Sequence, residues 1–219
     1  MEHRSILVWD VPQRLFHWAL ALLVVFSWLS AEAGGTWLKY HFWSGYAIGT
    51  LVGFRVLWGL IGSPHARFSG FVRGPRAVRD TLRALFGREA LPYVGHNPVG
   101  GWMVLALLGV LGFQFATGLF ANDDIMNEGP LYRHVSKSVS DFFTELHELN
   151  FGLLATLVGL HVAAIAWHRW RKGENLARAM VTGRKETAGT GESIRPAPWW
   201  LALVALAVAA AAVRGIITL

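Results

Sequence analysis

Residues His147 to His168, HELNFGLLATLVGLHVAAIAWH, form the most informative segment of the chain. A helix needs about 20 apolar residues to cross the hydrocarbon core of a bilayer. Residues 149–168 match that length and contain no Asp, Glu, Lys or Arg. The stretch therefore predicts a transmembrane helix, and the presence of His147 and His161 on it needs an explanation.

Four further segments have the same character: residues 15–31, 40–62, 91–122 (whose apolar part begins near Val99) and 196–213. The chain is 53% hydrophobic and 16% charged, against about 25% charged residues in an average soluble domain. We therefore predict an all-α integral membrane helical bundle. Residues 1–186 form a four-helix membrane core, and residues 187–219 form a linker and a fifth, C-terminal transmembrane helix.

The distribution of Lys and Arg predicts the orientation of the bundle. Most of them fall in the N-terminal segment, in residues 63–98 and in residues 169–195, whereas the opposite loops contain Lys39, Arg133 and Lys137. Cytoplasmic loops are enriched in basic residues, so we expect a cytoplasmic N-terminus. The net charge of +6 is then explained by basic cytoplasmic loops that face anionic membrane lipid. Nucleic-acid binding is not needed to explain it.

Residues 30–33 (Ser-Ala-Glu-Ala) could be read as a signal cleavage site. The preceding span is longer than a signal peptide needs, however, and it contains His17, Trp18 and Trp28. We expect it to be retained.

Four of the nine histidines lie on or at the predicted spans: His17, His41, His147 and His161. Ionisable side chains inside a bilayer are costly and usually functional. The 14-residue interval from His147 to His161 rotates a helix to within about 40° of four full turns and advances it by roughly 21 Å. Both rings therefore share one face, near opposite ends of the helix.

The alternating direction of the spans predicts the pairing of these histidines. His41 is expected to face His147 near the outer surface, and His17 to face His161 near the cytoplasm. The chain has no cysteine, which excludes thiolate sites and covalently attached haem. Two facing neutral imidazoles suit the axial positions of haem b, so we expect two haem b groups with these four histidines as iron ligands. His168 is an alternative to His161 as the second iron ligand on this helix. It would lie roughly 31 Å from His147 along the helix, so we favour His161.

Several segments together resemble the bacterial cytochrome b561-type diheme proteins, including the cytochrome b subunits of nickel–iron hydrogenases. They are WDVPQRLFHW around His17, His41 followed by Gly45 and Tyr46, GHNP at residues 95–98, the pair His147 and His161, and TGRK at residues 182–185. The resemblance implies a four-helix haem bundle in the bacterial inner membrane. It also implies electron transfer between a quinone, ubiquinone or menaquinone, and a periplasmic partner such as a c-type cytochrome or a hydrogenase.

Further residues are candidates for cofactor binding, each with an ordinary structural alternative. Gly45 and Gly49 could admit a haem face or allow close helix packing. Arg55 could bind a haem propionate or a quinone oxygen, or could extend to the membrane surface. His96 and Asn97, with Trp102, could form a quinone site on the cytoplasmic side, or Asn97 could simply cap a helix.

The loop at residues 121–146 is predicted to present an acidic surface to the periplasm, through Asp123, Asp124, Glu128, Asp141 and Glu145. Such a surface could dock an electron carrier. Membrane lipid is an expected partner, and the chain could form a homo-oligomer.

Two other functions remain open. One is a superoxide:quinone oxidoreductase that uses the same haems. The other is a histidine-lined metal or proton transporter, although the first four spans lack the Asp or Glu that a transporter would be expected to carry.

Overall fold

The computed structural model describes residues 4–86, 93–187 and 193–219. The helices are α1 (Val11–Ala33), α2 (Leu38–Ile61), α3 (Phe68–Phe71), α4 (Pro75–Phe86), α5 (Pro98–Gly118), α6 (Lys137–Lys172), α7 (Leu176–Thr182) and α8 (Trp199–Ile217). The strands are β1 (Arg4–Leu7) and β2 (Arg184–Thr187). Five helices, α1, α2 with the turn before it, α5, α6 and α8, are long and apolar enough to cross a membrane, which confirms the predicted helical membrane bundle.

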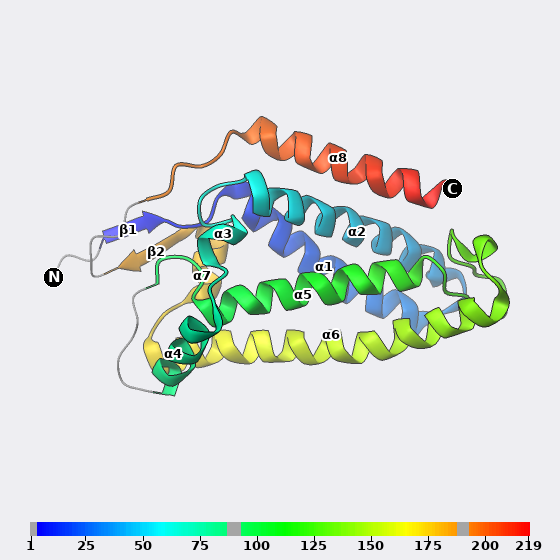
Figure 1. The fold of residues 1–219 in the computed structure, drawn as a ribbon, viewed down its shortest axis with the longest axis horizontal. Helices are drawn as coiled ribbons and strands as arrows, with labels where there is room; N and C mark the ends of the chain where they lie inside the picture. The colour runs from blue at the N-terminus through cyan, green and yellow to red at the C-terminus, as the bar shows by residue number, and fades with distance from the viewer. Residues whose placement is uncertain (1–3, 87–92, 188–192) are drawn as a thin grey trace.

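The long helices lie side by side (Figure 1). Helix α2 packs against α1, α5 and α8, and α5 packs against α6. Their outer faces carry exposed apolar side chains such as Leu22, Leu60 and Leu160. Such faces suit lipid, because a helix satisfies its own backbone hydrogen bonds and needs no water.

The two ends of the bundle differ (Figure 1). The short elements β1, β2, α3, α4 and α7 gather at one end, which we call the sheet end. The connection between α5 and α6, residues 119–136, and the C-terminus lie at the other end, which we call the loop end. The antiparallel sheet, with Leu7 opposite Arg184, and the short helices are features that the sequence analysis did not predict.

Helix boundaries follow local capping signals. The Asp10 carboxylate accepts a hydrogen bond from the Gln13 backbone N–H at 2.7 Å, at the start of α1. Asn97 accepts one from the Gly100 N–H at 2.7 Å before α5. Helix α6 ends at Gly173, whose φ of 68° is a left-handed conformation that favours glycine. Residue 91, where the third span was predicted to begin, lies outside the described residues.

Helix α6 corrects the predicted boundaries. Its helical conformation begins at Lys137, not near residue 149, so the loop predicted at residues 121–146 ends at Ser136. Asp141 and Glu145 therefore lie on helix α6. Hydropathy detected only the apolar middle of a helix that is roughly 54 Å long, well beyond the roughly 30 Å hydrocarbon core.

A buried carboxylate joins three parts of the chain at the sheet end. The second oxygen of Asp10, which is 3% exposed, accepts hydrogen bonds from Trp58 Nε1 at 3.2 Å and from the Ser63 hydroxyl. Ser63 Oγ in turn accepts one from the Ala197 N–H at 3.0 Å. The start of α1, the end of α2 and the segment before α8 are thereby held together.

Helix α8 lies along the outer side of α2. Its buried residues are Ala202, Ala205, Ala209 and Val213. A Cβ added to Gly53 of α2 would lie 3.2 Å from the Ala209 Cβ. The two helices therefore meet through small residues, as is common where helices associate in a bilayer.

The substitution Ala209→Leu should overfill this contact and lower the free energy of unfolding by about 1–3 kcal/mol. Circular dichroism of the detergent-solubilised chain would show this loss as a lower thermal midpoint. Val208→Leu is the matched control, because Val208 is 53% exposed and the change should stay within roughly 0.5 kcal/mol. Equal loss in both variants would contradict the described packing of α8.

Candidate functional site

The structure brings His41 and His147 together at the loop end, and we call them the loop-end pair. Their ring centroids lie 6.0 Å apart and the ring planes are inclined at 82°. His41 is in the first turn of α2 and His147 is ten residues into α6. The pairing agrees with the prediction made from the direction of the spans.

A cavity of about 560 Å³ surrounds the loop-end pair. Its walls include His41, His147, Gly45, Trp28 and Phe151. A Cβ added to Gly45 would meet no atom within 4 Å, so Gly45 faces open space. Gly49 differs, because a Cβ there would lie 2.6 Å from the Phe115 ring, which makes Gly49 a helix-packing residue.

Hydrogen bonds fix the orientation of both rings in the loop-end pair. His41 Nδ1 lies 2.9 Å from the Ser27 carbonyl oxygen, and His147 Nδ1 lies 3.0 Å from the Gln114 carbonyl oxygen. A carbonyl can only accept, so each Nδ1 carries the proton and donates it. The Nε2 lone pairs are then free to bind a metal, which is the usual arrangement of metal-binding histidines.

A polar bridge between α5 and α6 supports this arrangement. The Gln114 side-chain Nε2 donates to the His147 carbonyl oxygen at 3.0 Å, and Gln114 Oε1 accepts from Asn150 Nδ2 at 2.6 Å. Asn150 is 7% exposed. The sequence analysis missed Ser27, Gln114 and Asn150, although each is a polar residue inside an apolar span, which is the signal that could have identified them.

His17 of α1 and His161 of α6 face each other near the sheet end, and we call them the sheet-end pair. Their ring centroids lie 6.3 Å apart with the planes inclined at 53°. Both residues are half-buried, and His17 Nδ1 is buried without a hydrogen-bond partner in the described part of the chain. His168, the competitor of His161, instead contacts Glu174, with His168 Nδ1 3.8 Å from Glu174 Oε2.

The spacing within both pairs fits one metal ion between two imidazoles. An imidazole nitrogen binds a transition metal at about 2.0–2.1 Å, and the centre of the ring lies roughly 1.1 Å beyond that nitrogen. Two rings that bind one metal from opposite sides therefore have centres about 6.3 Å apart. The centroid separations of 6.0 and 6.3 Å match this value. The residues present therefore fit an iron, which His41 and His147 would hold at one end and His17 and His161 at the other.

Arg55 of α2 is fully enclosed at the sheet end. Its exposed fraction is 0%, and none of its three guanidinium nitrogens has a hydrogen-bond partner among the described residues. Its guanidinium carbon lies 5.0 Å from the Phe68 ring centre and 5.9 Å from that of Phe71. The alternative of an arginine extended to the membrane surface is wrong.

The remaining candidate residues at the sheet end have mixed roles. The His96 ring packs 4.6 Å from Trp9 and 4.7 Å from Phe71 between ring centroids, and its Nδ1 is buried without a described partner. Burial, reinforced by the charge of Arg55, lowers the pKa of His96 to about 3. Asn97 caps α5, and the Trp102 indole donates to the Arg73 carbonyl at 2.9 Å, so both have structural roles.

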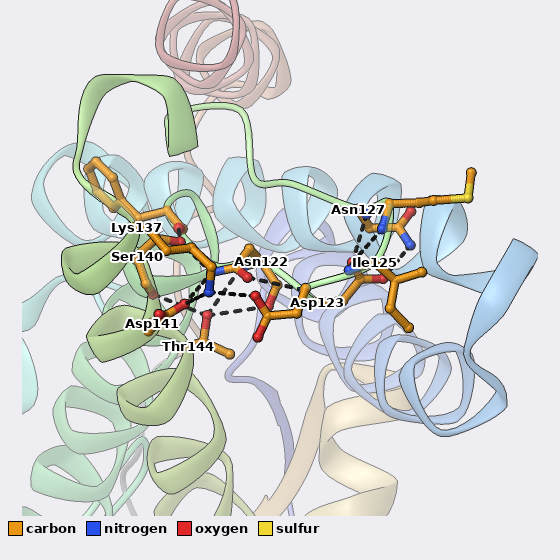
Figure 2. A network of polar contacts seen from close by, with 11 residues as sticks. Asn122, Asp123, Ile125, Asn127, Lys137, Ser140, Asp141 and Thr144 are labelled. Carbon is orange, nitrogen blue, oxygen red and sulfur yellow. Dashed lines mark hydrogen bonds and ion pairs between the residues drawn. The ribbon is translucent and has the colours of Figure 1, made fainter.

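A network of polar contacts orders the loop that borders the loop-end cavity (Figure 2). The Asp123 carboxylate accepts hydrogen bonds from the Asn127 side chain and from the backbone of Ile125, Met126 and Asn127, which hold its pKa well below the usual range. Asn122 bonds to Ser140 and Asp141 of α6. The loop is thus tied to the helix that carries His147.

A family model described as prokaryotic cytochrome b561 matches residues 8–183. The chain belongs to this family. It is also 26% identical, over 83% of its own length and 89% of the relative's, to a protein of Azotobacter chroococcum mcd 1 described as a probable Ni/Fe-hydrogenase B-type cytochrome subunit. No solved structure matches the chain.

Membership confirms the resemblance identified from the sequence. The chain is a multi-pass bacterial membrane protein and a b-type cytochrome that functions in electron transfer. Haem b is the group that such a cytochrome contains. The number of haems and the individual ligands remain predictions, which the two histidine pairs support.

We predict that Gln114→Leu weakens haem binding at the loop end, because it leaves the buried Asn150 amide and the His147 carbonyl without this partner. The variant should lose haem on heating or dilution at least several-fold faster than the wild type, as followed in the Soret band. Thr156→Val is the control, since Thr156 is exposed and bonds only to Gly152 within its own helix. Unchanged haem loss in Gln114→Leu would show that the bridge does not position His147.

Proposed function

We propose that this chain is a diheme cytochrome b that carries electrons across the bacterial inner membrane, between the quinone pool and a periplasmic redox partner. The observation that supports this most strongly is the presence of two histidine pairs with metal-binding spacing at opposite ends of the bundle. Along α6 the two ligands are separated by roughly 21 Å. One bound haem at each end would cover most of the membrane's apolar thickness.

The haem irons, when bound, supply one-electron chemistry, and the protein supplies position and environment. His41 and His147 are oriented by backbone carbonyls. Trp28 of α1 and Phe151 of α6 stack with ring centroids 6.4 Å apart and line the loop-end cavity. These aromatic walls would exclude water from the site.

The charge distribution supports a cytoplasmic sheet end and N-terminus. Exposed arginines at that end include Arg73, Arg76, Arg79 and Arg83, whereas the loop end carries Glu32, Asp124, Glu128, Glu145 and Glu148. Basic residues favour the cytoplasmic side. The loop-end pair would then lie near the periplasm and the sheet-end pair near the cytoplasm.

The acidic loop end suits a periplasmic electron carrier with a basic surface, because opposite charge accelerates encounter. The relative's name includes a Ni/Fe-hydrogenase, so a hydrogenase is one candidate partner, and a c-type cytochrome is another. Ile125 and Met126 are 84% and 86% exposed beside these acids, which adds an apolar contact to the charged surface.

For the quinone, ubiquinone or menaquinone, we favour the sheet end near His96 and Trp102. With a pKa of about 3, His96 is neutral at physiological pH, which suits a hydrogen bond to a quinone oxygen better than proton exchange. Asn97 and Trp102 contribute through the shape of this region, since their polar groups are already hydrogen-bonded.

The alternatives receive less support. Glu32, Asp123 and Glu148 line the loop-end cavity, and their charge would repel the superoxide anion. The described residues contain no group of three or more His, Asp or Glu side chains suited to a metal ion, which does not favour a metal transporter. The division at residue 186 and a homo-oligomer remain predictions.

The ligand assignment predicts site-selective loss of haem. His41→Ala or His147→Ala should remove the loop-end haem and leave one, because each removes an axial ligand. His17→Ala or His161→Ala should remove the sheet-end haem. Pyridine haemochrome quantification and the low-spin spectrum of the remaining haem would measure this.

His168→Ala is the matched control on α6 and should retain both haems. If His168→Ala loses a haem while His161→Ala does not, the assignment of His161 is wrong.

The quinone assignment predicts that His96→Leu retains both haems but is reduced by a quinol analogue roughly tenfold more slowly, the cost of one lost hydrogen bond. Stopped-flow absorption in proteoliposomes would measure the rate. His134→Leu, at an exposed position of the loop end, should react at the wild-type rate. If His134→Leu slows the reaction and His96→Leu does not, the quinone binds on the periplasmic side instead.

A further inference from the structure

Arg55 is a buried cation for which the described chain supplies no direct counter-ion. It is 0% exposed, and its three guanidinium nitrogens lack hydrogen-bond partners among the described residues. Its contacts with the Phe68 and Phe71 rings compensate only part of the lost hydration. A buried charge without a paired anion is strongly unfavourable.

Asp10 is the carboxylate whose charge acts on Arg55, but it does not pair with it. The two Asp10 oxygens accept hydrogen bonds from the Gln13 backbone, Trp58 and Ser63. No carboxylate in the described ranges lies within ion-pair distance of Arg55. Because the described residues supply no paired anion, a bound group is the candidate source of the counter-charge.

The position of Arg55 on α2 points to that group. Arg55 follows His41 by 14 residues, the same interval that separates His147 and His161 on α6. Fourteen residues return a helix to nearly the same face after roughly 21 Å. Since α2 and α6 both run from the loop end to the sheet end, Arg55 lies level with the sheet-end pair, on the face of α2 that carries His41.

We propose that Arg55 binds a propionate carboxylate of the haem held by His17 and His161. This inference rests on the proposed function, which supplies the haem. A propionate brings both the negative charge and the planar pair of oxygens that a guanidinium binds with two hydrogen bonds. A quinone oxygen would accept a hydrogen bond but would leave the charge uncompensated, so the structure favours propionate at Arg55 over quinone.

The first test measures the reduction potentials of both haems by spectroelectrochemistry. A cation near the iron stabilises the reduced state, which carries less positive charge. Arg55→Gln should therefore lower the potential of the sheet-end haem only, and Arg55→Lys should lower it less. Arg76→Gln, an exposed arginine of α4, is the matched control and should change neither potential.

The second test begins with Arg55 intact and changes the haem instead. Full-length apoprotein with His41→Ala, which leaves only the sheet-end site, is reconstituted with haem or with haem dimethyl ester, whose propionates are neutral. With Arg55 intact, this apoprotein should bind haem roughly tenfold or more tightly than haem dimethyl ester, because only haem can form the charge-assisted hydrogen bond. Adding Arg55→Gln should abolish that preference.

Equal affinity for haem and its ester with Arg55 intact would overturn the inference. So would an Arg55→Gln variant whose potentials are unchanged while its reaction with quinol slows, because Arg55 would then serve the quinone. Wild-type protein without bound haem would overturn the proposed function, and this inference with it.

Discussion

The distance between two facing imidazoles limits how the helices can be arranged at each end of the bundle. At both ends of the bundle the ring centroids lie about 6 Å apart, close to the separation that two imidazoles would have if they held one metal ion between them. One helix, α6, supplies a histidine to each pair, so its register fixes the position of both sites at once. Helices α1 and α2 each need to place only one histidine opposite it.

The two pairs have different surroundings, and the difference suits the two ends of an electron path. At the loop end, backbone carbonyls hold both Nδ1 protons and an acidic loop borders the cavity. At the sheet end, His17 Nδ1 and the Arg55 guanidinium are buried without described partners. A hydrogen-bonded histidine is a more basic ligand, whereas a nearby cation favours the reduced iron. Both effects would make a haem bound at the sheet end the better electron acceptor of the two.

Much of this arrangement follows from the sequence because hydropathy and helical periodicity are local properties. The five spans are read from uncharged stretches, and the 14-residue spacing places His147 and His161 on one face. The first three turns of α6 were missed because they lie beyond the apolar window and contain Asp141 and Glu145. The partners of the histidines were missed for another reason. Ser27 and Gln114 stand out as polar residues inside apolar spans, but their residue types do not show that their backbone carbonyls accept hydrogen bonds from His41 and His147. The isolated charge of Arg55 was visible in the sequence, but its enclosure by Phe68 and Phe71 depends on the three-dimensional packing.

The most direct test of the central claim is the haem content of the wild-type protein, purified in mild detergent and measured by the pyridine haemochrome assay together with near-infrared magnetic circular dichroism. The two histidine pairs predict two non-covalent haem b groups per chain, both low-spin with two imidazole ligands. A single haem per chain, or a ligand other than histidine at either iron, would contradict it.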